Sequence, residues 1–306
     1  MQQVLMGFAV VFLVVFVGYV LGRRNSLGAG GRQALASLVY LVATPALLFD
    51  RLIVTDPAEI FSANFVVIVA SALLAGFLFF LLCRTLLQRN TADSLIGMLA
   101  ASYANAGNLG IPLAVYVIDD AAAVVPVILF QVAFYAPITL TILDAVNSSQ
   151  QSNLLRNLIQ APLTNPMVIA AIIGMFFAFL EIPVPQLISE PVGILAGASV
   201  PLALLVFGMS LAGAPVLREG ARDAILASLF KVVLMPIIAG LMAHYIFGMQ
   251  GHALLTAVVL AALPTAQNVN AYALRFRTAE NLARDAGLVS TLACVPVLVL
   301  ISFLLG

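Results

Sequence analysis

Two amide-rich segments contain the residues of this sequence that are best placed to bind a ligand. The first reads NAGNLGIP, from Asn105 to Pro112, and the second reads LPTAQNVN, from Leu263 to Asn270. Each lies inside an apolar stretch long enough to cross a bilayer. Glycine and proline interrupt helices, and a broken backbone at membrane depth is tolerated only when protein buries it or a water-filled cavity receives it. The sequence therefore predicts two interrupted membrane helices that meet at a binding site.

An interrupted helix offers a specific chemistry to a ligand. Unpaired N–H groups begin one half-helix and unpaired C=O groups end the other. The N–H end carries a partial positive charge and suits an anion, while amide side chains add donors and acceptors without a fixed charge. From the two segments we predict these substrate-binding residues: Asn105, Gly107, Asn108, Gly110, Pro112, Pro264, Thr265, Gln267, Asn268 and Asn270.

Five further polar residues within apolar stretches are candidates for lining a cavity: Tyr103, Gln131, Tyr135, Ser199 and Lys231. Each of the uncharged ones also fits an ordinary role as a bonded group between packed helices, and the two breaks themselves also fit ordinary proline kinks. Two matched breaks with several amides each favour a site, because an unpaired amide in hydrocarbon costs several kcal/mol.

Lys231 is the one charge clearly inside a predicted span. A charge at that depth costs at least ~2.5 kcal/mol unless it reaches the interface or finds a partner. Two interpretations stay open: the side chain snorkels or pairs structurally, or it attracts an anion.

The central parts of the predicted spans contain no aspartate or glutamate, and Asp50, Asp119, Asp120 and Asp144 fall near span ends. This disfavours a cation antiporter that carries its ion on a buried carboxylate, and it favours an anionic substrate.

The two cysteines are far apart, and there is no Cys/His cluster, so we predict no metal site, no cofactor and no catalytic residues. The sequence shows no nucleophile–base or metal constellation, so an enzyme is not expected. It also shows no soluble signalling domain that would suggest a receptor.

Composition places the whole chain in a membrane. Hydrophobic residues make up 63% of the 306 residues, charged residues 8%, and mean hydropathy is +1.14, whereas soluble domains carry about 25% charged residues. The zero net charge gives no reason to expect a nucleic-acid partner. At about 20 residues per span, the apolar runs predict ten transmembrane helices near 4–22, 34–50, 61–83, 94–117, 122–145, 165–181, 191–213, 223–247, 252–274 and 284–305.

The arginines and the one lysine predict the orientation. Eleven of the thirteen basic residues fall in the odd-numbered loops, and cytoplasmic loops carry the positive excess. The odd loops are therefore expected in the cytoplasm and both termini outside. The first apolar run, Val4 to Leu21, is followed by Arg23 and Arg24, which indicates a retained span rather than a cleaved signal.

The halves of the chain match one another. Pro45 corresponds to Pro201 and Pro137 to Pro296, and the two breaks fall in the same register. Since five spans per half is an odd number, the second half enters the membrane in the opposite sense, as in inverted-repeat transporters. We predict an all-α membrane protein whose repeats cover 1–148 and 165–306, joined by a polar cytoplasmic linker at 149–164, with broken helices crossing in spans 4 and 9.

These segments resemble the auxin efflux carrier family, in its branch of bacterial organic-acid and malonate permeases. The resemblance is carried by NAGNLGIP, by ALPTAQ, by ATP at 43–45 and by FGMSLAG at 207–213. It implies a scaffold domain and a transport domain that carries the crossed helices. It also implies that the crossover is lined or shaped by Asn105, Gly107, Asn108, Pro112 and Pro264. The chain lacks the long cytoplasmic loop of many plant members.

The sequence thus predicts a secondary transporter in the bacterial inner membrane, a multi-pass protein that carries a small organic anion by elevator-type alternating access. The expected substrate is a mono- or dicarboxylate or an auxin-like acid. The alternative is a sodium-coupled organic-anion symporter of the bile-acid-transporter type, in which Thr265, Gln267 and backbone carbonyls bind Na⁺. Coupling to Na⁺ or H⁺, the direction of flux and the oligomeric state, for which a homodimer is one candidate, stay open.

Overall fold

The computed structural model describes residues 2–28, 30–54, 63–147, 166–212 and 221–305. Within these ranges the chain is all-helical, and the only bridge between extended segments is the isolated antiparallel pair Ala104 and Thr265. The predicted all-α class is confirmed for the described residues. The predicted linker at 149–164 lies outside them.

The first half of the chain forms helices that run from residue 2 to residue 147. They are α1 (Gln2–Arg23), α2 (Gly31–Leu38), η1 (Val39–Ala43), α3 (Thr44–Leu52), α5 (Ala63–Thr85), α6 (Thr91–Ser102), η2 (Ala106–Gly110), α7 (Ile111–Leu113), η3 (Ala114–Ile118), η4 (Ala121–Val124), α8 (Val125–Phe130), η5 (Gln131–Tyr135) and α9 (Ala136–Asn147). Segments that follow one another without a gap, such as α2, η1 and α3, form one continuous helix, here Gly31–Leu52.

The second half repeats this pattern of long and interrupted helices. Its elements are α11 (Pro166–Phe179), α12 (Gln186–Leu211), α13 (Ala221–Leu229), η6 (Phe230–Leu234), α14 (Met235–Leu241), η7 (Met242–Ile246), α15 (Gly251–Ala261), α16 (Gln267–Phe276) and α17 (Glu280–Leu305). The segments from α13 to η7 form one helix, Ala221–Ile246.

Five helices of the described residues are long and apolar enough to cross a bilayer on their own. They are Gly31–Leu52, Ala63–Thr85, Gln186–Met209, Ala221–Ile246 and Glu280–Leu305. Two of the predicted spans miss this length for a physical reason, because each is broken. The apolar run at 94–117 is divided between α6 and η2–η3, and the run at 252–274 is divided between α15 and α16.

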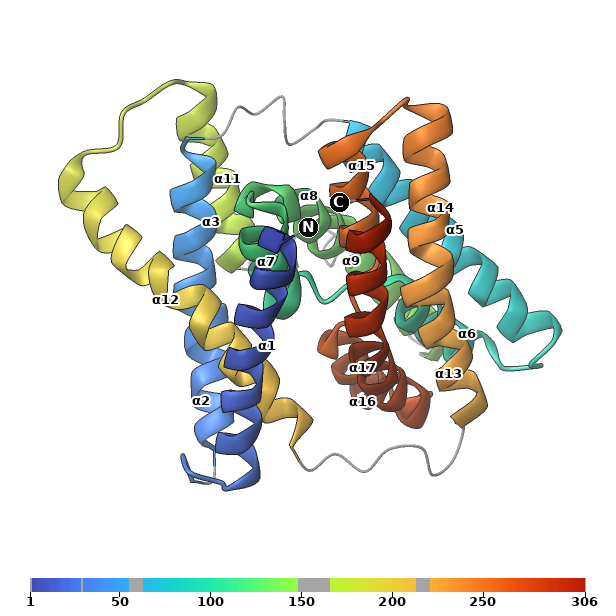
Figure 1. The fold of residues 1–306 in the computed structure, drawn as a ribbon. Helices are drawn as coiled ribbons and strands as arrows, with labels where there is room; N and C mark the ends of the chain where they lie inside the picture. The colour runs from blue at the N-terminus through green and yellow to red at the C-terminus, as the bar shows by residue number, and fades with distance from the viewer. Residues whose placement is uncertain (1, 29, 55–62, 148–165, 213–220, 306) are drawn as a thin grey trace.

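The helices gather in two groups, and each group combines both halves of the chain. In one group α1 packs against α12, and α3 packs against α11 and α12. In the other, α5 packs against α6 and α14, and α17 packs against α13, α15 and α16. Figure 1 shows the first group on the left of the view and α5, α6, α13 and α14 on the right. We call these the α1/α12 group and the α5/α17 group.

The buried side chains reflect the two groups. One hydrophobic core takes all its buried residues from 67–143 and 224–286, which belong to the α5/α17 group and the adjoining α8–α9 segment. The other core joins α1, α3, α11 and α12 to the residues that follow the first break, to the end of α15 and to the end of α17. Much of the α5/α17 group therefore packs around a core of its own, while the ends of α15 and α17 share the second core with the α1/α12 group.

Large apolar side chains also cover much of the outside. Leu13, Phe16, Ile194 and Leu304 are each more than 60% exposed. Such extensive exposure of apolar side chains is costly in water, and it agrees with an outer face that lipid covers.

Close helix packing holds the α1/α12 group together at two glycines. A Cβ on Gly208 would lie 2.0 Å from the Val15 carbonyl oxygen, and one on Gly18 would lie 2.3 Å from the Leu205 carbonyl oxygen. Small residues allow helix backbones in membranes to approach this closely, and here the neighbouring atoms are backbone, which cannot move aside.

Replacing Gly208 with Ala should separate α1 from α12 and lower the free energy of unfolding by about 1–3 kcal/mol, the usual cost of overpacking. The measurement is thermal unfolding of the purified protein in detergent. Gly197→Ala on the same helix is the matched control, because a Cβ at Gly197 meets no atom within 4 Å. Equal melting temperatures for the two variants would contradict this account of the packing.

Candidate functional site

The two helix breaks are bonded directly to each other. The Asn105 N–H donates to the Pro264 carbonyl at 2.8 Å, and the Ala266 N–H donates to the Tyr103 carbonyl at 3.0 Å. Together with the Ala104–Thr265 bridge, these bonds make a short antiparallel pairing between segments about 160 residues apart in the sequence. The meeting of the two breaks, expected from the sequence, is present in the structure.

The second break begins where the helical bonding pattern stops. Pro264 has no N–H and cannot bond to the carbonyl four residues earlier. The N–H of Thr265 donates instead to the Ser290 Oγ at 3.0 Å. Two successive carbonyls at the end of α15, those of Leu260 and Ala261, therefore lose their helical donors, and the helix ends there.

The first break has a different cause, because its proline does not lie at the break. Pro112 lies inside the continuous helical stretch 106–118, several residues after the break. The chain leaves α6 at Tyr103, which has extended backbone angles. The Asn105 N–H then bonds to Pro264 rather than to the carbonyl of Ala101. Pairing with the partner segment thus ends this helix.

Side chains satisfy the backbone groups that the pairing leaves over. The Thr265 hydroxyl donates to the Ala100 carbonyl at 2.6 Å. In the orientation that satisfies both of its polar ends, the Gln131 amide donates to the Ala104 carbonyl at 2.9 Å and accepts from the Ala104 N–H at 2.8 Å. Thr265 and Gln131 are buried, and they stabilise the breaks by replacing the lost helical hydrogen bonds.

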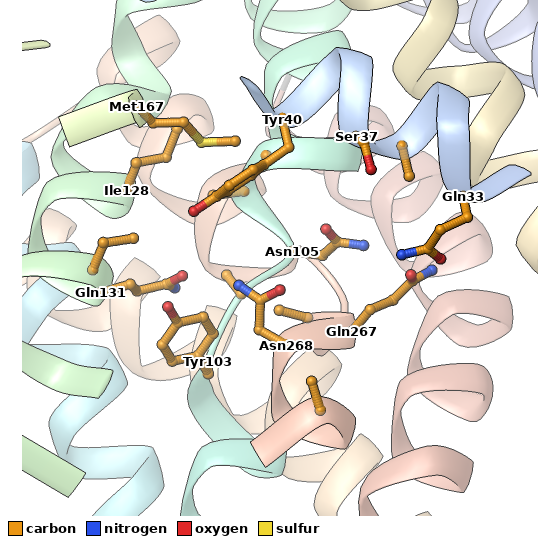
Figure 2. A pocket seen from close by; sticks show the side chains of 17 residues that line it. Gln33, Ser37, Tyr40, Tyr103, Asn105, Ile128, Gln131, Met167, Gln267 and Asn268 are labelled. Atoms are coloured by element: carbon orange, nitrogen blue, oxygen red, sulfur yellow. The ribbon is translucent and has the colours of Figure 1, made fainter. Parts of the chain in front are cut away.

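A cavity of about 400 Å³ lies beside the paired breaks. Tyr103, Asn105 and Gly107 border it from the first break, and Gln267 and Asn268 border it from the start of α16. Figure 2 shows Asn105, Gln267 and Asn268 beside one another, with Gln33, Ser37 and Tyr40 on the opposite side. The cavity therefore lies between the α1/α12 group, which supplies the last three residues, and the breaks.

The walls of this cavity are polar but uncharged. Among the described residues that line it, the polar side chains are amides and hydroxyls, with no aspartate, glutamate, lysine or arginine. The N-terminus of α16 also borders the cavity through Ala266 and Gln267. No side chain caps this helix start and no acidic residue stands in its first turn, so its partial positive charge is open to a ligand.

A second cavity of about 300 Å³ adjoins the first and shares Ala266, Gln267 and Ala271 with it. Its lining includes two arginines, Arg32 on α2 and Arg284 on α17. An anion in the first cavity would therefore have guanidinium groups on one side.

The predicted site residues are distributed over distinct places. The first cavity is lined by Tyr103, Asn105, Gly107, Gln131, Gln267 and Asn268. Asn270 lines the second cavity. Gly110, Pro112, Pro264 and Thr265 are buried and line neither cavity, and the side chain of Asn108 lies outside the described part of the structure.

Three predicted cavity residues make structural bonds away from the cavity. The Tyr135 hydroxyl bonds to the Ser102 hydroxyl at 2.6 Å, and Ser199 bonds to the Thr44 hydroxyl at 3.1 Å. Lys231 is fully buried and donates to the Ala261 carbonyl at 2.7 Å. The structure shows the structural pairing that the first interpretation of Lys231 includes, and the side chain does not snorkel to the interface. The second interpretation, attraction of an anion, stays a prediction.

Sequence reasoning missed the wall supplied by α2 and η1. Gln33, Ser37 and Tyr40 follow one another at spacings of four and three, which places them on one helix face. That polar stripe was a usable signal. Sequence reasoning also missed Asp285, which is fully buried in the second turn of α17 and bonded to the Arg284 Nε at 2.8 Å, because its burial depends on helices that meet only in the folded chain.

Comparison with known proteins shows the family of this chain. The family model described as "Membrane transport protein" matches residues 3–302. The chain belongs to this family, of the auxin efflux carrier type, and the resemblance seen in its motifs is thereby confirmed. It is a membrane transporter and not an enzyme.

Its relatives carry transporter names. The chain is 27% identical to a protein of Rhizobium meliloti (strain 1021) named "Putative malonate transporter", over 93% of this chain and 90% of that one. It is 25% identical to "Uncharacterized transporter YfdV" of Escherichia coli (strain K12), over 93% and 92%. It is also 25% identical to an "Uncharacterized transporter" of Methanothermobacter thermautotrophicus, over 84% and 83%.

The Thr265 hydroxyl provides a direct test of the paired breaks. Thr265→Val keeps the shape but leaves the Ala100 carbonyl without its donor, and it should lower the free energy of unfolding by about 1–3 kcal/mol. Thermal unfolding in detergent measures this. Thr265→Ser retains the hydroxyl and should stay close to the parent protein. If the valine variant were as stable as the serine variant, the hydroxyl would not support the break.

Proposed function

We propose that this transporter carries a small organic anion, a mono- or dicarboxylate or an auxin-like acid. The observation that carries the proposal is the cavity between the breaks and the α1/α12 group, with its uncharged polar walls and the uncapped start of α16. Amides and first-turn N–H groups can donate to a carboxylate. The cavity volume is in the range of small-molecule sites.

The charge distribution around the cavity supports an anionic substrate. No acidic side chain lines either cavity within the described residues, whereas Arg32 and Arg284 line the second one. The charge of Arg284 is balanced by its ion pair with the buried Asp285 at 2.8 Å, so Arg32 makes the larger contribution to the positive potential there. A dicarboxylate would place one carboxylate at Asn105 and the start of α16 and direct the other towards the arginines. The printed name of the R. meliloti relative refers to malonate, a small dicarboxylate, and this agrees with the proposed substrate class.

The proposed mechanism is elevator-type alternating access. Much of the α5/α17 group packs around a hydrophobic core of its own, and the ends of α15 and α17 also pack in the core of the α1/α12 group. The proposal requires these shared contacts to rearrange when the α5/α17 group moves. The cavity lies at the boundary between the breaks and the α1/α12 group, since Gln33 and Tyr40 face Asn105 and Asn268 across it. A substrate bound at the breaks would move with the α5/α17 group and would become accessible from the opposite side of the membrane.

We further propose ten spans in two inverted repeats, residues 1–148 and 165–306, with a cytoplasmic linker between them. Matching contacts support the repeat. Gln131 accepts from the Ala104 N–H in the first half, and Ser290 accepts from the Thr265 N–H in the second. Each acceptor stands six residues before a proline, Pro137 or Pro296. The arginine distribution supports a bacterial inner membrane protein with both termini outside.

Asn105→Ala should weaken binding and transport of malonate about tenfold to a hundredfold, the effect of losing one hydrogen bond to a charged group. Uptake into proteoliposomes and the shift of melting temperature with malonate measure the two effects. Asn281→Ala, an exposed amide that lines neither cavity, is the control. Unchanged uptake by a folded Asn105→Ala protein would remove Asn105 from the binding site.

Arg32→Gln should raise the KM for dicarboxylates about twofold to fivefold, as expected for one exposed charge, with a smaller effect on monocarboxylates. The difference should fade at high salt because ions screen exposed charges. Initial uptake rates at two ionic strengths test this. Arg24→Gln changes an exposed arginine that lines neither cavity. An equal rise in KM for both variants would contradict a role of the second cavity.

A further inference from the structure

The proposed function does not use the charge of Lys231. Lys231 is the only lysine of the chain, lies in η6 within the helix Ala221–Ile246, and is fully buried. Its Nζ donates to the Ala261 carbonyl at 2.7 Å and lies 3.4 Å from the Met235 sulfur. No carboxylate pairs with it among the salt bridges of the described residues. A buried ammonium without a carboxylate needs another source of negative potential.

That source is the end of the half-helix α15. The Ala261 carbonyl loses its helical donor because the Thr265 N–H bonds to Ser290, and the preceding carbonyl loses its donor because Pro264 has none. Unpaired carbonyls at a helix C-terminus carry a partial negative charge that favours a cation. Lys231 thus places a positive charge at one of the carbonyls that the break has freed.

The corresponding place in the first half is filled differently. There the Ala100 carbonyl near the end of α6 accepts from the neutral Thr265 hydroxyl at 2.6 Å. A hydroxyl is therefore sufficient to satisfy a carbonyl at a broken helix. A neutral donor would also satisfy the Ala261 carbonyl, so hydrogen bonding alone does not explain why the charged Lys231 stands there.

Half-helix C-termini and unwound carbonyls are also the groups that hold coupling cations in transporters with broken helices. We propose that the Lys231 ammonium is a tethered substitute for such a cation, so that the α15 end is charge-compensated without a bound ion and transport needs no sodium. This inference rests on the proposed function for its transport assay. It assigns to Lys231 a positioning role, because the residue acts through the end of α15 and lines neither cavity.

The first experiment compares malonate uptake into proteoliposomes in sodium chloride and in choline chloride. The parent protein should transport equally in both. Lys231→Ala should lose about tenfold or more of the rate in choline, the fold-change of one charge-assisted hydrogen bond, and recover most of it in sodium, because Na⁺ would take the place that the ammonium leaves at the freed carbonyls. Met235→Leu, which removes the sulfur contact but leaves the ammonium on Ala261, should behave like the parent protein.

Lys231→Gln separates charge from hydrogen bonding. The glutamine amide can still donate to the Ala261 carbonyl but brings no charge, so this variant should also become sodium-dependent. If Lys231→Gln transported in choline at the rate of the parent protein, the proposal would be overturned, and the role of Lys231 would be limited to its hydrogen bond. So would a parent protein that needs sodium, or a Lys231→Ala protein that transports normally in choline.

Thermal unfolding in detergent distinguishes failure of this inference from failure of the proposed function. It needs no substrate, so it stays informative if the parent protein does not carry malonate. Sodium chloride should raise the melting temperature of Lys231→Ala in a saturable way relative to choline chloride, and should leave the parent protein unchanged. A Lys231→Ala protein that sodium neither stabilises nor rescues would overturn the tethered-cation role.

Discussion

The need to bond every backbone N–H and C=O group within a membrane governs the centre of this protein, because hydrocarbon offers no water as a partner. Two helices are interrupted, and each interruption leaves backbone donors and acceptors without their helical partners. Part of this need is met by pairing the two breaks with each other, through Asn105 with Pro264 and Ala266 with Tyr103. The remainder is met by side chains from neighbouring helices, and these contacts fix where the breaks can lie.

The same bonds separate structural polar groups from those that face the cavity. Thr265, Ser290 and Lys231 are buried and bonded to backbone groups of the breaks. Asn268 and Gln267, one turn further on, are exposed to the cavity. Within this short segment Thr265 therefore supports the break, whereas Gln267 and Asn268 face the cavity.

The architecture places this centre at a boundary that suits transport. Each helix group draws on both halves of the chain, as the packing of α1 and α3 against α12 and of α5 against α14 shows (Figure 1). The cavity opens where Gln33 and Tyr40 of one group meet the breaks (Figure 2). Under the proposed mechanism, relative motion of the two groups would change access at this boundary, and it would rearrange the core that α15 and α17 share with the α1/α12 group.

The sequence by itself determined the helical membrane class, the two breaks and the family, because hydropathy, proline and amide clusters are local signals. It could not decide the partners of Lys231 and Gln131, since these bonds depend on helices that meet only in the folded chain. It placed Pro112 at a break that pairing with Pro264 creates earlier, at Tyr103 and Asn105. The far wall of the cavity likewise came from tertiary structure, because α2 reaches the breaks only through packing.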